Sequence, residues 1–135
     1  IAFGVAFVYQ QKIDEINILN ASIRAMQLAL KKLKIDPQYI IVDGNHFSQF
    51  KKIPHKCIIK GDCKYQNIAA ASILAKTYRD DYMKKIGSDF PKYNWKNNKG
   101  YPTRDHRKAI EEFGLTKHHR KSFQLLPNQI KINLK

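Results

Sequence analysis

The chain has 135 residues, which is the length of one domain rather than two. Lysine and arginine number 25 against 11 aspartates and glutamates, and the resulting net charge of +14 indicates a polyanionic partner. Because 43% of the residues are apolar and 11% are aromatic, the composition excludes a disordered cationic tail. No apolar run approaches the roughly 18 residues that a membrane-spanning helix needs, so we expect no membrane interaction.

The two cysteines, Cys57 and Cys63, are too few for a disulfide framework, and no export signal is recognisable. We therefore expect a protein of the reducing cytoplasm. The sequence opens at Ile1, without a methionine, inside a run that already has the pattern of a structural element. This favours the interpretation that the sequence is a piece of a longer chain.

The N-terminal part predicts a strand followed by a helix. Apolar side chains alternate between two faces along residues 1–9, and this period of two is typical of a strand. Along residues 15–33 they recur every three or four positions, which predicts an amphipathic helix. Asp14 and Glu15 favour a helix start at this point, because acidic side chains interact well with the positive N-terminal end of a helix.

Two short apolar runs, residues 39–42 and 57–59, predict strands that are buried on both faces. Asp43 follows the first run and Asp62 follows the second, each beside a glycine. Ligands of open α/β sheets bind outside the carboxyl ends of the strands, and carboxylate oxygens suit Mg²⁺ or Mn²⁺. We therefore expect the two carboxylates to lie close together at neighbouring strand ends. The alternative is that each aspartate and its glycine only make a turn.

The second half predicts two helices separated by an exposed loop. Residues 66–85 form a helix rich in small side chains, which would let its backbone lie close to a sheet or another helix. Residues 87–102 are polar and rich in Lys, Asn, Gly and Pro, so we expect an exposed loop. A short helix follows over 103–113, with Thr103 as N-cap and Gly114 at its C-terminal end. Strand, helix, strand, strand and helix together predict an α/β domain.

The exposed loop carries Tyr101 on a turn between Gly100 and Pro102, among lysines. An aromatic ring on such a basic, constrained turn is suited to stacking on a base or a sugar. The alternative is an ordinary turn tyrosine that packs against the following helix.

Other polar clusters do not predict a site. His118 and His119 have no partner residues at metal-ligand spacing, and we expect them at the surface of a tail that has little core to bury. The histidines and cysteines lack the paired spacing of a zinc site. Arg79 and Asp80 predict an ion pair at the surface or at a helix end.

Taken in order, several motifs resemble bacterial ribonuclease HII, and the match is collinear over nearly the whole chain. Each motif is weak alone, whereas their order and spacing are specific. They are Asp14-Glu15-Ile16-Asn17-Ile18-Leu19, Val42-Asp43-Gly44-Asn45, Lys60-Gly61-Asp62 with Ala69-Ala70-Ala71-Ser72-Ile73-Leu74-Ala75-Lys76 and Arg79-Asp80, Lys99-Gly100-Tyr101-Pro102-Thr103 with His106, and His118-His119-Arg120-Lys121-Ser122-Phe123.

The resemblance implies a ribonuclease H-like α/β fold, a mixed sheet flanked by helices with a helical C-terminal region. It implies a single domain over residues 1–135, with a core of about 1–86 and a substrate-binding loop and helical region of about 87–135. It further implies a metal-dependent endoribonuclease that cuts on the 5′ side of ribonucleotides. The implied substrates are RNA/DNA hybrids and DNA duplexes with a single embedded ribonucleotide, and we expect a monomer.

The resemblance also implies roles for residues. Asp43 and Asp62 match two catalytic carboxylates that bind Mn²⁺ or Mg²⁺, and Tyr101 matches the tyrosine that stacks on the sugar at the RNA-to-DNA junction. Further candidates for nucleic-acid contacts are Lys60, Asn45 and Lys76.

This sequence departs from the family at its N-terminus, where the Asp-Glu-x-Gly-Arg-Gly motif of the first strand is absent. That motif supplies the other two of the family's four carboxylates and senses the 2′-hydroxyl, the group that distinguishes RNA from DNA. The resemblance therefore implies an N-terminally incomplete domain whose first strands are missing. We expect the chain alone to be inactive and poorly stable.

A non-catalytic basic nucleic-acid-binding module is the alternative, because charge alone can bind a polyanion. Metal dependence separates the two hypotheses. The module would lose affinity smoothly with salt and ignore Mg²⁺, whereas a chelator would abolish the activity of the enzyme.

Overall fold

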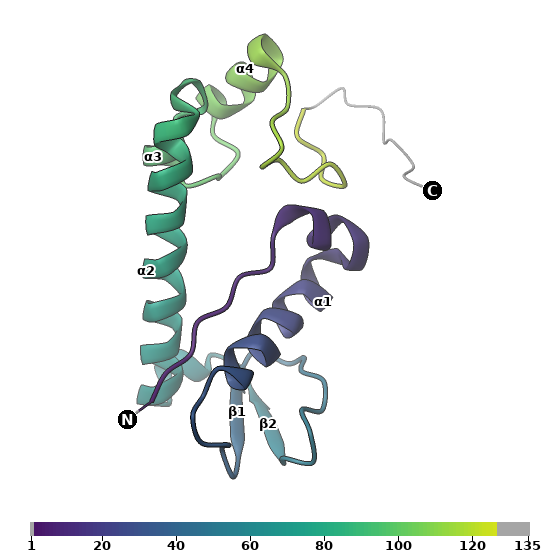
Figure 1. Cartoon of the computed structure of the whole chain (residues 1–135), viewed down its shortest axis with the longest axis vertical. Helices are drawn as coiled ribbons and strands as arrows, with labels where there is room; N and C mark the ends of the chain where they lie inside the picture. Colours follow the sequence, from purple (N-terminus) through teal and green to yellow (C-terminus); the bar gives the residue numbers. More distant parts are fainter. Residues whose placement is uncertain (1, 127–135) are drawn as a thin grey trace. The chain divides into compact units, whose positions relative to one another are not determined.

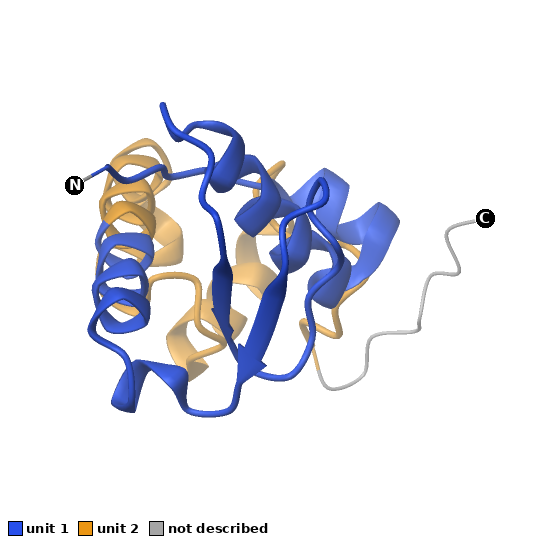
Figure 2. Cartoon of the chain, turned by 90° about the horizontal axis from the view of Figure 1, so that it is seen from below, with its two compact units in different colours: residues 1–77 blue, residues 78–135 orange. Residues whose placement is uncertain are grey.

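A computed structural model describes residues 2–126 of the chain. The chain divides into two compact units, residues 1–77 and 78–135, which are coloured separately in Figure 2. The boundary falls inside helix α2 (Gln66–Asp89), so this helix contributes to both units. The sequence-based division into a core of about residues 1–86 and a C-terminal region of about 87–135 stays a prediction.

Helix α1 (Gln10–Lys31) begins earlier than the sequence pattern predicts and contains a break. At Asn17 the backbone has φ 64° and ψ 169°, which is outside the helical region. The Asn17 side chain accepts a 3.0 Å hydrogen bond from the N–H of Asn20, three residues on. This is the contact of an N-cap, so Asn17 restarts the helix close to the predicted start.

Strands β1 (Ile40–Asp43) and β2 (His55–Ile58) pair in parallel, with the first residues of the two strands opposite each other. They lie side by side in Figure 1 and are the whole sheet within the described residues. Met26 and Leu30 of α1 pack against the buried cluster formed by Ile40, Val42 and Phe50. Both strands exist, but the prediction that they are buried on both faces is wrong. Strand β1 buries Ile40 and Val42, whereas in β2 only Ile58 is buried, and Ile59, predicted to end the second strand, lies outside β2 and is 65% exposed. Among the described residues no further strand or sheet covers them.

The strand predicted for residues 1–9 is wrong for the described part of that segment, which belongs to no strand. The segment contacts α1 instead, since the Lys32 ammonium, just past the end of the helix, donates a 2.6 Å hydrogen bond to the carbonyl of Val5. A period of two makes a strand only where a neighbouring strand satisfies the backbone N–H and C=O groups. Among the described residues, no strand pairs with this segment.

Helix α2 extends beyond its predicted end, to Asp89. Its run of small side chains, residues 69–75, is largely exposed, and Ile73 is 67% exposed. The close packing predicted for this run is therefore not found within the described chain. Neither α2 nor any other helix between residues 2 and 126 is long and apolar enough to cross a membrane.

Residues 87–102, predicted as an exposed loop, are mostly structured and partly buried. The segment contains the end of α2, the 3₁₀ turn η2 (Pro91–Tyr93) and the short helix α3 (Trp95–Asn98). Tyr93 and Trp95 are buried in the core of unit 2, with ring centroids 5.2 Å apart. The prediction is wrong because a segment of polar average composition buries its largest aromatic side chains.

Helix α4 (Arg104–Phe113) confirms the prediction made from its caps. The Thr103 side chain accepts a 3.3 Å hydrogen bond from the N–H of His106, and Gly114 ends the helix with φ 77°. The buried side of α4 packs into the core around the Tyr93 ring.

His119 is buried, contrary to the prediction of two surface histidines. It is 6% exposed, and its ring stacks on that of His106 with a centroid distance of 5.3 Å. The Nδ1 atom of His119 accepts a 2.9 Å hydrogen bond from the N–H of Thr116. Burial, together with the neighbouring His106, lowers the pKa of His119 to about 4, so the ring is neutral at pH 7.

Acidification should destabilise the fold through His119. The pKa of this ring is about 4 in the folded protein, against an ordinary value of 6.5, so the unfolded chain binds the proton more tightly. The stability contributed by the neutral ring is complete above about pH 6.5 and is lost progressively as the pH falls toward about 4. We expect the melting temperature, followed by circular dichroism, to fall between pH 7 and pH 5.

His119→Asn is the matched variant, because the asparagine Oδ1 can replace Nδ1 as an acceptor and does not titrate. Its melting temperature should depend less on pH than that of the wild type, whereas His46→Asn, at an exposed position, should keep the wild-type dependence. The same pH dependence in His119→Asn and the wild type would contradict this role of the buried ring.

Candidate functional site

Asp43, the last residue of β1, is joined to the turn that follows β2. Its Oδ1 accepts a 2.8 Å hydrogen bond from the backbone N–H of Gly61, the residue before Asp62. A Cβ atom at Gly61 would lie 2.8 Å from Cδ1 of Ile68, so a larger residue would displace the end of that side chain. Because the strands are parallel, Asp43 and Asp62 are at the same end of the sheet.

Asp62 lies in the 3₁₀ turn η1 (Gly61–Cys63), where its Oδ1 accepts a 3.0 Å hydrogen bond from the N–H of Cys63. Lys60, just before this turn, has a left-handed backbone with φ 54° and ψ 46°. That conformation costs a non-glycine residue about 1–2 kcal/mol, so contacts such as the one from Asp43 must offset it. The side chains of Lys60 and Asp62 are both exposed and open to a ligand.

Asn45 and Lys76 are exposed as well. Asn45 comes two residues after β1, and its Oδ1 lies 2.6 Å from Nδ1 of His46, which donates because an amide oxygen only accepts. Lys76 is on α2, the helix that follows Asp62 in the chain. Both side chains belong to unit 1, as do the two aspartates.

The carboxylates of Asp43 and Asp62 supply only part of a metal site. Residues 2–126 contain no group of three or more His, Cys, Asp or Glu side chains placed to hold a metal ion. Mg²⁺ requires an octahedral shell of oxygen ligands, and one oxygen of Asp43 is already engaged by the N–H of Gly61. The described residues by themselves therefore do not fit a complete two-metal centre.

Tyr101 belongs to unit 2 and lies on the turn between α3 and α4, where it is 58% exposed. The two preceding residues, Lys99 and Gly100, both have left-handed backbones, with φ 50° and 79°. The N–H of Tyr101 donates a 2.8 Å hydrogen bond to the carbonyl of Asn98. This tight turn leaves the ring accessible for stacking.

The side chain of Asn98 holds this turn in place, a role that the sequence did not predict. It is 7% exposed, and its Oδ1 accepts a 2.8 Å hydrogen bond from the N–H of Gly100. Its Nδ2 donates a 2.8 Å hydrogen bond to the carbonyl of Tyr93, which anchors the turn to the core. The tripeptide Asn-Lys-Gly is a turn signal in which the asparagine side chain bonds the backbone two residues on, so this contact had a local signature.

Arg79 of α2 also contacts the turn. Its guanidinium donates a 2.8 Å hydrogen bond to the carbonyl of Lys99 and lies 5.5 Å from the centre of the Tyr101 ring. The predicted ion pair with Asp80 is confirmed, at 3.8 Å. Arg79 is far from the turn in the sequence, and no local pattern indicates these contacts.

Comparison with known proteins gives the family. The family model described as ribonuclease HII matches residues 1–126. A ribonuclease HII from Christiangramia forsetii is 67% identical over 133 residues, covering 98% of this chain and 67% of that protein. One from Parabacteroides distasonis is 53% identical over 130 residues, covering 96% and 65%. The chain thus spans about two thirds of the length of the curated relatives it matches.

Among solved structures, the crystal structure of ribonuclease H2 from Pyrococcus horikoshii superposes with a TM-score of 0.70, covering 87% of this chain and 63% of that one. At 23% sequence identity this likeness shows the fold alone, and it confirms the predicted ribonuclease H-like α/β class. Because the family model spans nearly all of the chain and curated relatives are more than half identical to it, the chain belongs to the ribonuclease HII family.

Proposed function

We propose that the protein containing this chain is a divalent-metal-dependent endoribonuclease. Its substrates are RNA/DNA hybrids and DNA duplexes with a single embedded ribonucleotide, which it cuts on the 5′ side of the ribonucleotide. Membership of the ribonuclease HII family supports the reaction class. The net charge of +14 supports a nucleic-acid substrate.

The observation that carries the proposal is the hydrogen bond from Gly61 to Asp43. It fastens the turn that carries Asp62 to the end of β1, so that two carboxylates occupy one end of a parallel pair of strands. This is the place where open α/β sheets bind their ligands.

Mn²⁺ or Mg²⁺ is the proposed cofactor, with Asp43 and Asp62 as two of its ligands. The remaining ligands are carboxylates that the described residues do not bring to this end of the sheet. That residues 1–135 alone are inactive therefore stays a prediction.

The exposed side chains of Lys60, Asn45 and Lys76 are proposed to contact the nucleic acid, and Tyr101 is proposed to stack on the sugar at the junction. A cation beside the backbone positions a duplex without reading its sequence. Stacking on an exposed ring is also tolerant of sequence. Recognition would therefore depend on the presence of a ribonucleotide rather than on a base sequence.

The non-catalytic binding module is disfavoured, because its charge argument applies equally to the enzyme and does not explain the aspartates at the sheet end.

The cytoplasm is the proposed location, which the free thiols of Cys57 and Cys63 support. A monomer and a single ribonuclease H-like domain are proposed as well.

Neutralising either aspartate should abolish cleavage without unfolding the protein. Asp43→Asn retains an oxygen that can accept from the N–H of Gly61, and Asp62→Asn retains one for Cys63. Because bound metal ions supply several kcal/mol of transition-state stabilisation, the cleavage rate should fall by about 100-fold or more. The measurement is cutting of a fluorescent single-ribonucleotide duplex with Mn²⁺ by the protein containing this chain.

Asp36→Asn is the control, because Asp36 is an exposed carboxylate whose ion pair with Lys51, at 2.6 Å, is worth little at the surface. It should cleave at the wild-type rate, and a chelator should stop both proteins. Cleavage by Asp62→Asn at the rate of the control would overturn the assignment of the metal ligands.

Tyr101→Ala should reduce cleavage at a DNA–RNA–DNA junction. The loss of one stacking contact, about 1–3 kcal/mol, corresponds to roughly 5- to 150-fold in kcat/KM. Tyr101→Phe keeps the ring and should remain near the wild type, and binding to an all-DNA duplex should hardly change in either variant. If Tyr101→Ala cleaved as fast as Tyr101→Phe, the tyrosine would be a turn residue only.

A further inference from the structure

The turn that carries Tyr101 is unusual for its backbone. Lys99 and Gly100 are both left-handed, and a left-handed lysine is disfavoured by about 1–2 kcal/mol. Such a conformation persists only where the surrounding structure holds it. Two side chains from helices do so here, since Asn98 accepts from the N–H of Gly100 and Arg79 donates to the carbonyl of Lys99.

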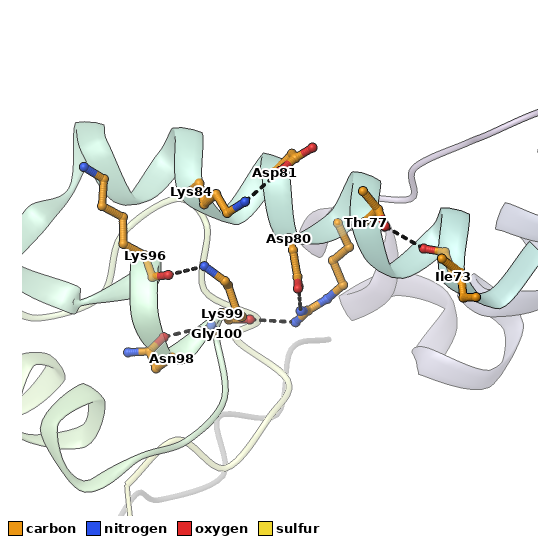
Figure 3. A network of polar contacts seen from close by, with 10 residues as sticks. Ile73, Thr77, Asp80, Asp81, Lys84, Lys96, Asn98, Lys99 and Gly100 are labelled. Atoms are coloured by element: carbon orange, nitrogen blue, oxygen red, sulfur yellow. Dashed lines mark hydrogen bonds and ion pairs between the residues drawn. The ribbon is translucent and has the colours of Figure 1, made fainter.

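Arg79 differs from Asn98 because it contacts both the backbone of the turn and the aromatic ring at its tip. Its guanidinium pairs with Asp80 and donates a hydrogen bond to the carbonyl of Lys99, and Figure 3 shows Asp80 on α2 near the turn formed by Asn98, Lys99 and Gly100. The same guanidinium lies over the ring of Tyr101, with 5.5 Å from Cζ to the ring centre. A planar guanidinium can donate hydrogen bonds from its edge while its face rests on an aromatic ring.

The turn also packs closely against α2. Gly100 leaves little room for a side chain, because a Cβ atom there would lie 3.1 Å from Cε of Met83 and 3.8 Å from Nη2 of Arg79. The guanidinium also lies 3.8 Å from Oδ1 of Asp80, one residue on in the same helix. Arg79 therefore reaches the turn directly from the helix against which the turn packs.

We propose that Arg79 is a positioning residue that holds the Tyr101 ring in the orientation needed to stack on the sugar at the junction. The inference rests on the proposed function and deepens it. An exposed tyrosine on an unsupported turn would occupy several rotamers, and ordering it would cost free energy when the substrate binds. The contacts of Arg79 fix the turn and one face of the ring beforehand, which leaves the opposite face for the sugar.

The competing role for an exposed arginine in a nuclease is a direct contact with a phosphate. The two roles predict different behaviour, because a phosphate contact weakens binding to every duplex and lowers the salt dependence of affinity. A positioning residue acts through Tyr101 alone. Its removal should therefore impair cutting at the ribonucleotide and leave affinity for an all-DNA duplex unchanged.

The test is a double-mutant cycle between Arg79 and Tyr101 in the protein containing this chain. Arg79→Met keeps much of the side-chain length without the charge, and we expect it to lower kcat/KM on a single-ribonucleotide duplex by about 3- to 10-fold. In the Tyr101→Ala background the same substitution should change kcat/KM by less than about twofold, because the residues act as one unit. Effects that simply multiply would overturn the proposal.

Arg79→Lys is the conservative variant and should remain impaired, because an ammonium lacks the planar face that rests on the ring while the edge of a guanidinium donates to Lys99. Lys84→Met is the matched control, because it also removes a cation from α2. The Lys84 ammonium pairs with Asp81 at 3.0 Å, and its loss should leave kcat/KM unchanged. Equal affinity of the wild type and Arg79→Met for an all-DNA duplex, across a salt series, supports positioning. Weaker binding with a smaller salt slope would overturn it in favour of a phosphate contact.

An NMR measurement separates failure of this inference from failure of the proposed function. With ring-labelled tyrosine, the Tyr101 signals, assigned by their loss in Tyr101→Phe, should shift in Arg79→Met and not in Lys84→Met. Unchanged Tyr101 signals would overturn the inference whether or not the protein cleaves RNA. Shifted signals in a protein that cuts no ribonucleotide would support the held ring and overturn the proposed function.

Discussion

The candidate site depends on one hydrogen bond, from the N–H of Gly61 to the carboxylate of Asp43. The sheet has only two strands among the described residues, and its ladder ends at Asp43 and Ile58. Beyond that point the backbone has no strand partner, so a side chain must satisfy the N–H of the turn. A carboxylate is a strong acceptor for this purpose, and in accepting it becomes fixed beside the turn that carries Asp62.

The Tyr101 turn is built on the same principle. Both turns contain a lysine–glycine pair in which the lysine is left-handed, with φ 54° at Lys60 and 50° at Lys99. In both, a side-chain oxygen from outside the pair accepts the N–H of the glycine: Asp43 in the first turn and Asn98 in the second. The bond offsets the backbone strain, so each exposed candidate side chain, Asp62 and Tyr101, lies on a turn that is held by a side-chain contact.

The core of unit 2 buries two histidine side chains, His106 and His119. His106 and His119 stack on each other and lie against the rings of Tyr93 and Trp95. Burial lowers the pKa of both histidines, which keeps them neutral. Asn98 is anchored to the carbonyl of Tyr93, so the packing of this cluster also fixes the turn that precedes α4.

The sequence by itself determined the elements whose signals are local. Helix α4 is set by the hydroxyl of Thr103 and the flexibility of Gly114, and both act within one turn of the helix. The strand β1 follows from a continuous apolar run, whereas β2 only overlaps the run that predicted it, and the ordered motifs identified the family. The candidate site residues were chosen from the sequence alone, and the role of each stays a prediction.

Only the tertiary structure decided the features that need a distant partner. Residues 1–9 alternate as a strand does, but a ladder requires a neighbouring strand, and none pairs with the described part of the segment. His119 has the same local surroundings as His118 in the sequence, and its burial follows from the ring of His106 on another element. Arg79 reaches Tyr101 only because the chain folds back from α3 onto α2. Contacts between residues far apart in the sequence leave no trace in local composition or period, because they depend on how the elements pack.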